Sequence, residues 1–130
     1  MPDKISHFEL PVSDLAKSRK FYNKVLGWKF TKAPMPGFEY WLIDTGSKEV
    51  GGGMYKKTDP KQGPVNYASV KSIDATVKKF KSAGGKVISP KQEIPEVGWV
   101  AIGVDHEGNS IGFWQDKPKR SSRRKAPSKR

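Results

Sequence analysis

The chain begins with a stretch in which apolar and more polar residues alternate. Between positions 5 and 12 the two alternating sets are Phe8, Leu10 and Val12, and His7, Glu9 and Pro11. Such alternation is typical of a half-buried β-strand, because successive side chains point to opposite faces of a sheet. We therefore expect the apolar set to pack beneath a helix, with His7 and Glu9 sharing the opposite face.

The spacing of apolar residues then becomes helical. Ser13 and Asp14 can cap a helix whose apolar positions recur up to Leu26, and Gly27 is a typical helix stop. Three more strands are expected over residues 28–30, 38–45 and 49–56, with turns at 34–37 and 46–47. The first half thus has the order strand, helix and three strands.

The second half repeats this order after a linker at residues 60–64. Its expected elements are a strand over 65–70, a helix capped by Ser72 and running to Ala83, and strands over 86–89, 99–104 and 110–115. Asp14 of the first half corresponds to Ser72 of the second. The pattern predicts an α+β fold of two βαβββ modules, over about residues 5–57 and 64–115, within one domain at residues 1–116.

The charge of the chain is concentrated at its C-terminus. The 130 residues carry a net charge of +12, and eight of the fourteen residues from Lys117 to Arg130 are basic while none is acidic. This segment has no aliphatic side chain larger than Ala126, so it buries too little surface to offset its conformational entropy. We expect residues 117–130 to form a disordered basic tail.

Several classes of protein are excluded by the composition. The absence of cysteine excludes a disulfide scaffold, a thiolate nucleophile and a zinc site built on Cys. No apolar run approaches the roughly 18 residues that a membrane helix needs. Residues 1–10 lack the basic, apolar and cleavage regions of a signal peptide. We therefore expect a cytoplasmic protein with no membrane span.

Short motifs occur at matching places in the two halves. The first half contains Ser6-His-Phe-Glu-Leu-Pro-Val-Ser-Asp-Leu15, Phe21-Tyr22 and Val25-Leu-Gly-Trp28, and the second contains Ser72-Ile-Asp-Ala75, Gly84-Gly-Lys86 and Asp105-His-Glu-Gly-Asn109. Over about residues 5–115 this combination resembles the vicinal oxygen chelate superfamily. That superfamily includes glyoxalase I, extradiol dioxygenases, and fosfomycin and bleomycin resistance proteins. The common form of the last motif has Pro where this chain has His106.

The resemblance implies curved mixed sheets around a cavity, and in the metal enzymes of the family four strand positions bear the ligands. These positions fall on His7, Gly53, Val65 and Gly112 in this chain. A single imidazole does not hold a catalytic divalent ion, which usually has three or four protein ligands, and Glu9 would add only one carboxylate. We therefore expect no bound metal and no other cofactor.

Strand alternation, the family's ligand positions and aromatic character together suggest which other residues border the cavity. The expected ligand-binding residues are Tyr67, Ser69, Trp99, Trp114, Gly53 and Gly112. The three aromatic side chains could stack on a flat ligand, although plain packing is the alternative. The two glycines remove side chains where family ligands would be, which would leave room for a bulky ligand.

Three classes of function remain open. The leading hypothesis is a metal-independent small-molecule-binding protein of the glyoxalase and bleomycin-resistance type. The second is a lyase, isomerase or dioxygenase that uses His7 and Glu9 as catalytic residues with a loosely held divalent metal. The third is a polyanion-associating protein that binds nucleic acid or an anionic surface through Lys117–Arg130. The resemblance also implies a homodimer.

Overall fold

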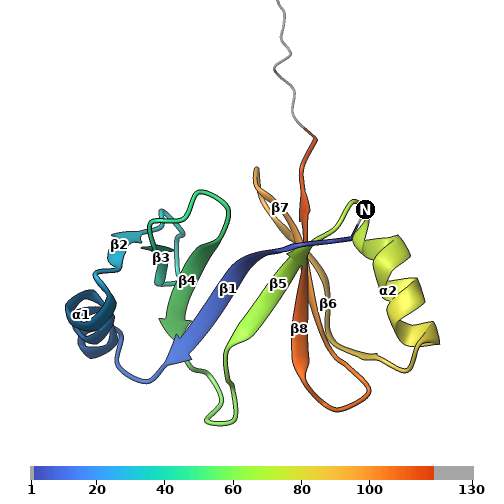
Figure 1. Ribbon diagram of the computed structural model, residues 1–130, viewed down its shortest axis with the longest axis horizontal. Coiled ribbons are helices and arrows are strands. Elements are labelled where there is room, and N and C mark those ends of the chain that lie inside the picture. The colour runs from blue at the N-terminus through green and yellow to red at the C-terminus, as the bar shows by residue number, and fades with distance from the viewer. Residues whose placement is uncertain (1, 119–130) are drawn as a thin grey trace, which may run out of the picture.

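The computed structural model describes residues 2–118, and their strands form one mixed sheet (Figure 1). The eight strands lie in the order β2-β3-β4-β1-β5-β8-β7-β6. At the centre, β1 (Ile5–Val12) and β5 (Val65–Ser69) pair antiparallel, with His7 opposite Tyr67 and Glu9 opposite Val65. The α+β fold of two βαβββ modules is therefore confirmed, and the two modules share a single sheet through this central pair.

The first module occupies one half of the sheet. After β1 it contains α1 (Leu15–Leu26), β2 (Lys29–Lys32), β3 (Tyr40–Asp44) and β4 (Gly51–Lys56). The Asp14 carboxylate caps α1 by accepting the Lys17 N–H at 3.0 Å. Gly27 ends the helix in the left-handed conformation, with φ of 74°. Both helix ends are therefore where the sequence predicts them.

The second module repeats the arrangement. After β5 it contains α2 (Ile73–Ser82), β6 (Lys86–Ile94), β7 (Gly98–Val104) and β8 (Ser110–Asp116). Ser72 caps α2 by accepting the Ala75 N–H at 3.1 Å. β6 extends past the predicted end at residue 89 and includes Pro90. A proline fits there because β6 is an edge strand, where its missing N–H breaks no ladder bond between two neighbours.

The pairing within each module follows the same rule. β1 and β4 run parallel with Glu9 opposite Gly53, and β5 and β8 run parallel with Tyr67 opposite Gly112. Because Glu9 and Tyr67 stand the same distance ahead of their helix caps, these two pairs occupy equivalent places in the two modules. The repeat predicted from element order is thus also a repeat of register.

The two helices bury very different amounts of apolar surface. Beneath α2, the side chains of Val70, Ile73, Ala101 and Phe113 form a core, with Phe80 packed against it. α1 has no buried residue, and its Phe21, Val25 and Leu26 are all more than half exposed. The two helices lie at opposite ends of the curved sheet (Figure 1). The apolar face of α1 is therefore largely uncovered in a single chain.

The C-terminal end of the described chain is attached to the sheet. The Lys117 N–H donates to the Val97 carbonyl at 3.2 Å, and the Lys117 ammonium contacts the Glu93 carboxylate. Lys117, which begins the predicted tail, is therefore ordered, while residues 119–130 of that tail lie outside the described residues. Within the described part of the chain, no helix is long and apolar enough to cross a membrane.

Candidate functional site

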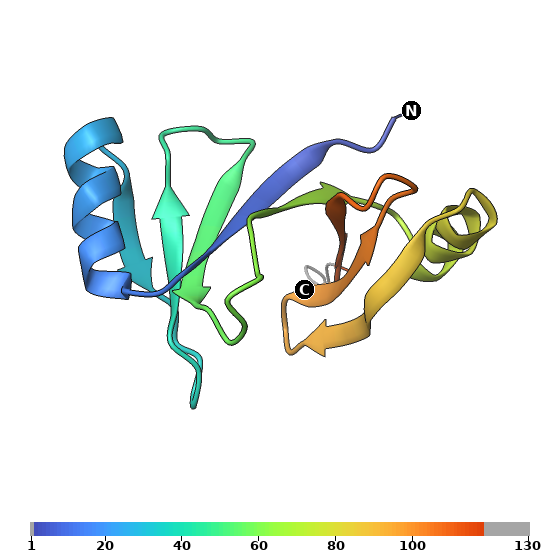
Figure 2. The ribbon, with the colours of Figure 1, turned by 90° about the horizontal axis from the view of Figure 1, so that it is seen from below.

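A cavity of 880 Å³ lies against the face of the central strands that bears His7 and Glu9. Its walls include the turn between β2 and β3 and the turn between β6 and β7, which project to the same side of the sheet (Figure 2). Most of its lining side chains are apolar or aromatic, among them Met35, Phe38, Leu42, Ile94, Val97, Val100 and Trp114. Because both modules supply a wall, the cavity depends on the assembled domain.

The Glu9 carboxylate is held by two tyrosine hydroxyls at the base of this cavity. Tyr40 Oη donates to Glu9 Oε2 and Tyr67 Oη donates to Oε1, each over 2.8 Å. Tyr40 is 9% exposed and Tyr67 is 3% exposed, so both donors are fixed by packing. Hydrogen bonds to an ionised acceptor are stronger than neutral ones. The pair therefore fixes the position of the carboxylate.

His7 extends this network by one hydrogen bond. Its Nε2 lies 3.0 Å from Tyr40 Oη. The single proton of Tyr40 is directed to Glu9, so Tyr40 Oη accepts at this contact and His7 Nε2 donates. The chain of donors thus runs from His7 through Tyr40 to Glu9. This arrangement assigns the proton of a neutral His7 ring to Nε2 and leaves Nδ1 unprotonated.

Burial sets the charge states of the groups around Glu9. The pKa of Tyr40 and of Tyr67 is raised well above 10.0, first by burial and then by the negative charge of Glu9, so both remain donors. The pKa of His7 is lowered from 6.5 because burial disfavours the imidazolium, and the nearby Glu9 charge opposes this effect. At neutral pH the imidazole is therefore mainly uncharged.

Several predicted site residues do line this cavity. The structure brings together His7 and Glu9 from β1, Tyr67 from β5 and Trp114 from β8. The ring of His7 lies 5.7 Å from that of Tyr67 and 6.3 Å from that of Trp114, centroid to centroid. The strand alternation therefore placed these four side chains on the correct face.

The space expected at the two glycines is already filled. A Cβ at Gly53 would collide with the ring and hydroxyl of Tyr40, and a Cβ at Gly112 would collide with the ring of Tyr67. The expectation that these glycines leave room for a ligand is wrong, because each makes room for a tyrosine that holds Glu9. Their role in the structure is to admit Tyr40 and Tyr67.

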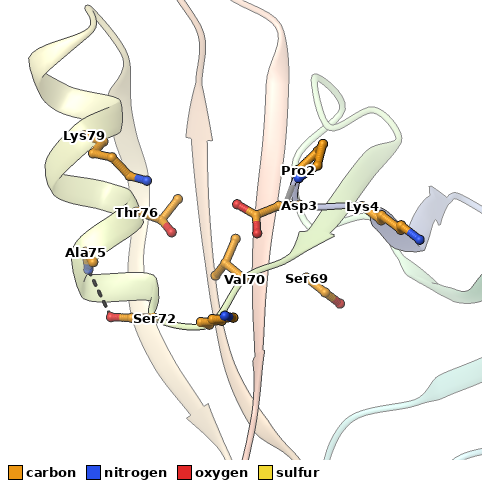
Figure 3. Close-up of a pocket in the computed structure, with 10 residues that line it drawn as sticks. Pro2, Asp3, Lys4, Ser69, Val70, Ser72, Ala75, Thr76 and Lys79 are labelled. Carbon is orange, nitrogen blue, oxygen red and sulfur yellow. Dashed lines mark hydrogen bonds between the residues drawn. The ribbon is translucent and has the colours of Figure 1, made fainter.

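Ser69 and Trp99 do not line the cavity. Ser69 Oγ lies 2.5 Å from Ser6 Oγ, and Ser69 borders a second hollow of 600 Å³ between the N-terminal residues and α2 (Figure 3). Trp99 packs against the core beneath α2, on the opposite side of the sheet. Trp99, expected among the ligand-binding residues, therefore does not border this cavity, and its neighbour Val100 does.

Sequence reasoning missed Tyr40 and the turn at residues 94–97, and it predicted the turn at 34–37 without placing it at the cavity. In the predicted strand over residues 38–45, two alternating sets are both largely apolar, so alternation could not show which set faces inward. The sets are Phe38, Tyr40 and Leu42, and Glu39, Trp41 and Ile43. The register that pairs Tyr40 with Tyr55 in β4 provides this information. The turn residues 33–36 and 94–97 border one cavity only because the two modules share a sheet, which no local pattern encodes.

The residues present do not fit the divalent metal of the family's enzymes. Of the four ligand positions, Gly53, Val65 and Gly112 supply no donor side chain, and the tyrosine rings occupy the space beside the two glycines. In the part of the chain covered by the structure, no three His, Asp or Glu side chains gather closely enough to hold a metal ion. The chemistry of this site therefore rests on His7, Glu9 and the tyrosines.

Comparisons with known proteins agree with the fold and identify the family. The family model described as "Bleomycin resistance protein-like N-terminal" matches residues 4–46. A "Glyoxylase-like domain-containing protein" of Didymella fabae is 31% identical over 114 residues, covering 82% of this chain and 88% of that protein. The chain therefore belongs to the glyoxalase and bleomycin-resistance family, the vicinal oxygen chelate superfamily.

Other similar proteins match at lower identity. "Putative glyoxylase CFP32" of Mycobacterium bovis is 26% identical over 126 residues, covering 82% of this chain and 43% of that protein. The chain thus spans less than half the length of this relative. Methylmalonyl-CoA epimerase from Mycobacterium tuberculosis superposes with a TM-score of 0.69 at 17% identity, covering 91% of each chain. This likeness concerns the fold alone.

Proposed function

We propose that this chain is a metal-independent small-molecule-binding protein whose ligand occupies the 880 Å³ cavity. The observation that carries this proposal is the Glu9 carboxylate, fixed by Tyr40 and Tyr67 in a largely apolar cavity. A large apolar cavity with a few convergent polar groups is the usual form of a small-molecule site. The volume falls in the range of sites that enclose drug-sized ligands.

The test is a ligand screen with a variant that fills the cavity. Protein in excess chelator is mixed with a metabolite set and examined by native mass spectrometry, and hits are mapped by NMR. Leu42→Trp, on the cavity wall, should abolish binding. Ile88→Trp is the matched control, because Ile88 is an exposed strand residue that does not line the cavity. Hits that survive Leu42→Trp, or that require added metal, would contradict the proposal.

A second candidate function is an enzyme that transfers protons through His7 and Glu9. Their Nε2 and Oε2 atoms are 4.0 Å apart, and burial favours the neutral imidazole, which can accept a proton. Bound ligand converted to product by the wild-type chain and not by His7→Ala would favour this lyase or isomerase function. Tightly held metal, about one per chain and lost in His7→Ala, would restore the metal-dependent version.

Two partner proposals extend beyond the cavity. The homodimer is supported by the exposed Phe21, Val25 and Leu26 of α1, because monomers rarely leave a large apolar patch uncovered. Sedimentation that finds only monomer at micromolar concentration would contradict it.

Association with nucleic acid or an anionic surface through residues 117–130 is supported by sequence charge alone. A DNA-binding salt titration of full-length protein and a chain ending at Pro118 tests it.

A further inference from the structure

The charges that line the cavity have one sign. The whole chain has a net charge of +12, with 25 Lys and Arg residues. Yet among residues 2–118 no Lys or Arg lines the cavity, whereas Glu9 and Glu96 both do. The cavity lining thus has the opposite charge to the strongly basic chain as a whole. It predicts that the cavity has a negative electrostatic potential.

The charge of Glu9 has no full cationic partner in the described structure. The only ion-pair contact of Glu9 there is His7, at 4.0 Å, and burial shifts that imidazole toward its neutral form. The hydroxyls of Tyr40 and Tyr67 stabilise the carboxylate without neutralising it. Carboxylates that are mostly buried are normally paired with a cation. The Glu9 side chain is 18% exposed and lines the cavity, so a cationic group of a bound ligand could pair with it there.

Glu96 places a second carboxylate at the cavity wall in an unfavourable backbone conformation. It lies in the turn from Ile94 to Val97, which is closed by a 3.0 Å bond from the Val97 N–H to the Ile94 carbonyl. Its φ is 67°, and it is the only residue besides glycine with positive φ among residues 2–118. A turn with Pro95 first and positive φ next strongly favours Gly or Asn at the position that Glu96 occupies. Residues held in such conformations cluster at functional sites.

We propose that the cavity, if it binds small molecules as argued above, selects ligands that have an apolar body and a protonated amine. The amine would donate to Glu9 at the base of the cavity. The apolar body would contact Phe38, Leu42 and Val97 on the walls. Trp114 lines the same cavity, and an indole ring attracts a cation placed over its face. Glu96 adds long-range attraction near the turn.

The same features disfavour anionic ligands. A CoA thioester carries several phosphate charges, and proteins bind phosphate with Arg, Lys or helix N-termini. None of the described Lys or Arg side chains lines the cavity, and the start of α2 lies at the separate hollow bordered by Ser72 (Figure 3). Methylmalonyl-CoA, the ligand that gives the structurally similar epimerase its name, is such a thioester. We therefore expect this cavity to disfavour it.

The test uses three probes of nearly equal size and different charge: 4-phenylbutylamine, 4-phenylbutanol and 4-phenylbutyrate. Binding to wild-type protein is measured by NMR titration at neutral pH and low salt. The ammonium probe should bind about tenfold tighter than the alcohol, as expected for a hydrogen bond to a charged group, and the carboxylate probe should bind weakest. Glu9→Gln should remove most of the preference for the amine. Glu107→Gln is the control, because Glu107 is exposed and lies outside the cavity.

The outcomes separate this proposal from the binding function on which it rests. If the alcohol or the carboxylate binds as tightly as the amine, with shifts at Trp114 and Tyr67, the charge selection is wrong and cavity binding stands. If none of the probes binds at millimolar concentration, both proposals are wrong. The wild-type ratios decide the question even if Glu9→Gln fails to fold. An amine preference that Glu107→Gln removes equally would overturn the role of Glu9.

Discussion

The hydroxyl of Tyr67 donates a 2.8 Å hydrogen bond to the carboxylate of Glu9, its counterpart in the other module. Each of these residues stands the same distance ahead of a helix cap, Glu9 before Asp14 and Tyr67 before Ser72. Their strands pair antiparallel at the centre of the sheet, so the repeat brings the two positions together. An acceptor at one position and a donor at the other link the halves directly.

Removing either tyrosine hydroxyl should destabilise the domain. Tyr67→Phe and Tyr40→Phe each leave one Glu9 oxygen without its buried donor, and each should lower the free energy of unfolding by about 1–3 kcal/mol. Tyr55→Phe is the matched control, since its hydroxyl makes no hydrogen bond among the described residues, and its effect should stay within about 0.5 kcal/mol. Urea denaturation measures all three. Equal effects at the three positions would contradict the assigned network.

Stability should decline in alkali because of the same two tyrosines. Their pKa values are raised above 10.0 in the folded chain, so the unfolded chain loses these protons first as the pH rises. Their stabilisation is complete below pH 10.0 and falls above it, by about 1.4 kcal/mol per pH unit for each tyrosine. Denaturation at several alkaline pH values, compared with the Tyr40→Phe/Tyr67→Phe double variant, isolates this effect. Parallel pH profiles for the two proteins would contradict it.

His7 should titrate below 6.5 in an NMR experiment. Burial lowers its pKa and the charge of Glu9 partly offsets this, so Glu9→Gln should lower the pKa further, whereas Glu107→Gln should leave it unchanged. The contribution of His7 to stability is present above pH 6.5 and is lost as the pH falls, because the unfolded chain binds the proton first. A higher pKa for His7 in Glu9→Gln than in the wild type would show that the electrostatic assignment is wrong.

Two glycines of the same strand should differ in their tolerance of a methyl group. A Cβ at Gly53 meets the hydroxyl and ring of Tyr40, whereas a Cβ at Gly51 meets nothing within 4 Å. Gly53→Ala should cost about 1–3 kcal/mol as Tyr40 is displaced from Glu9. Gly51→Ala should change stability by less than about 0.5 kcal/mol. Thermal melts of the two variants give the comparison, and equal melting temperatures would contradict it.

The strand alternation in β1 was sufficient to predict that His7 and Glu9 share the face of the sheet that borders the cavity. His7 and Glu9 alternate with an apolar set that must pack beneath a helix. The two residues therefore had to share the opposite face of the sheet, and both side chains line the cavity. Three helix ends could also be predicted from the sequence, because Asp14 and Ser72 have side chains that cap helix starts and Gly27 readily adopts the left-handed conformation that ends a helix. These features are local, and local chemistry determines them.

Other features depended on contacts between distant segments. In β3 both alternating sets are largely apolar, so the inward position of Tyr40 is fixed only by its pairing with β4. Trp99 and Val100 are adjacent and both apolar, so the sequence does not show which of them faces the cavity. The packing of α2 places Trp99 on the face of the sheet that α2 covers. The presence of glycine at position 53 was visible in the sequence, but the tyrosine that fills its space was not.

The tyrosines that occupy the glycine positions also limit how this protein can change during evolution. A mutation at Gly53 that introduced a metal-binding side chain would meet Tyr40, and one at Gly112 would meet Tyr67. Each such gain would therefore first require a smaller residue in place of the tyrosine, which would release Glu9 from a donor. A single substitution at either position thus cannot add a donor side chain without displacing a tyrosine. The order of mutations at these two sites, and not merely their number, therefore decides whether a donor side chain can be added without displacing a tyrosine.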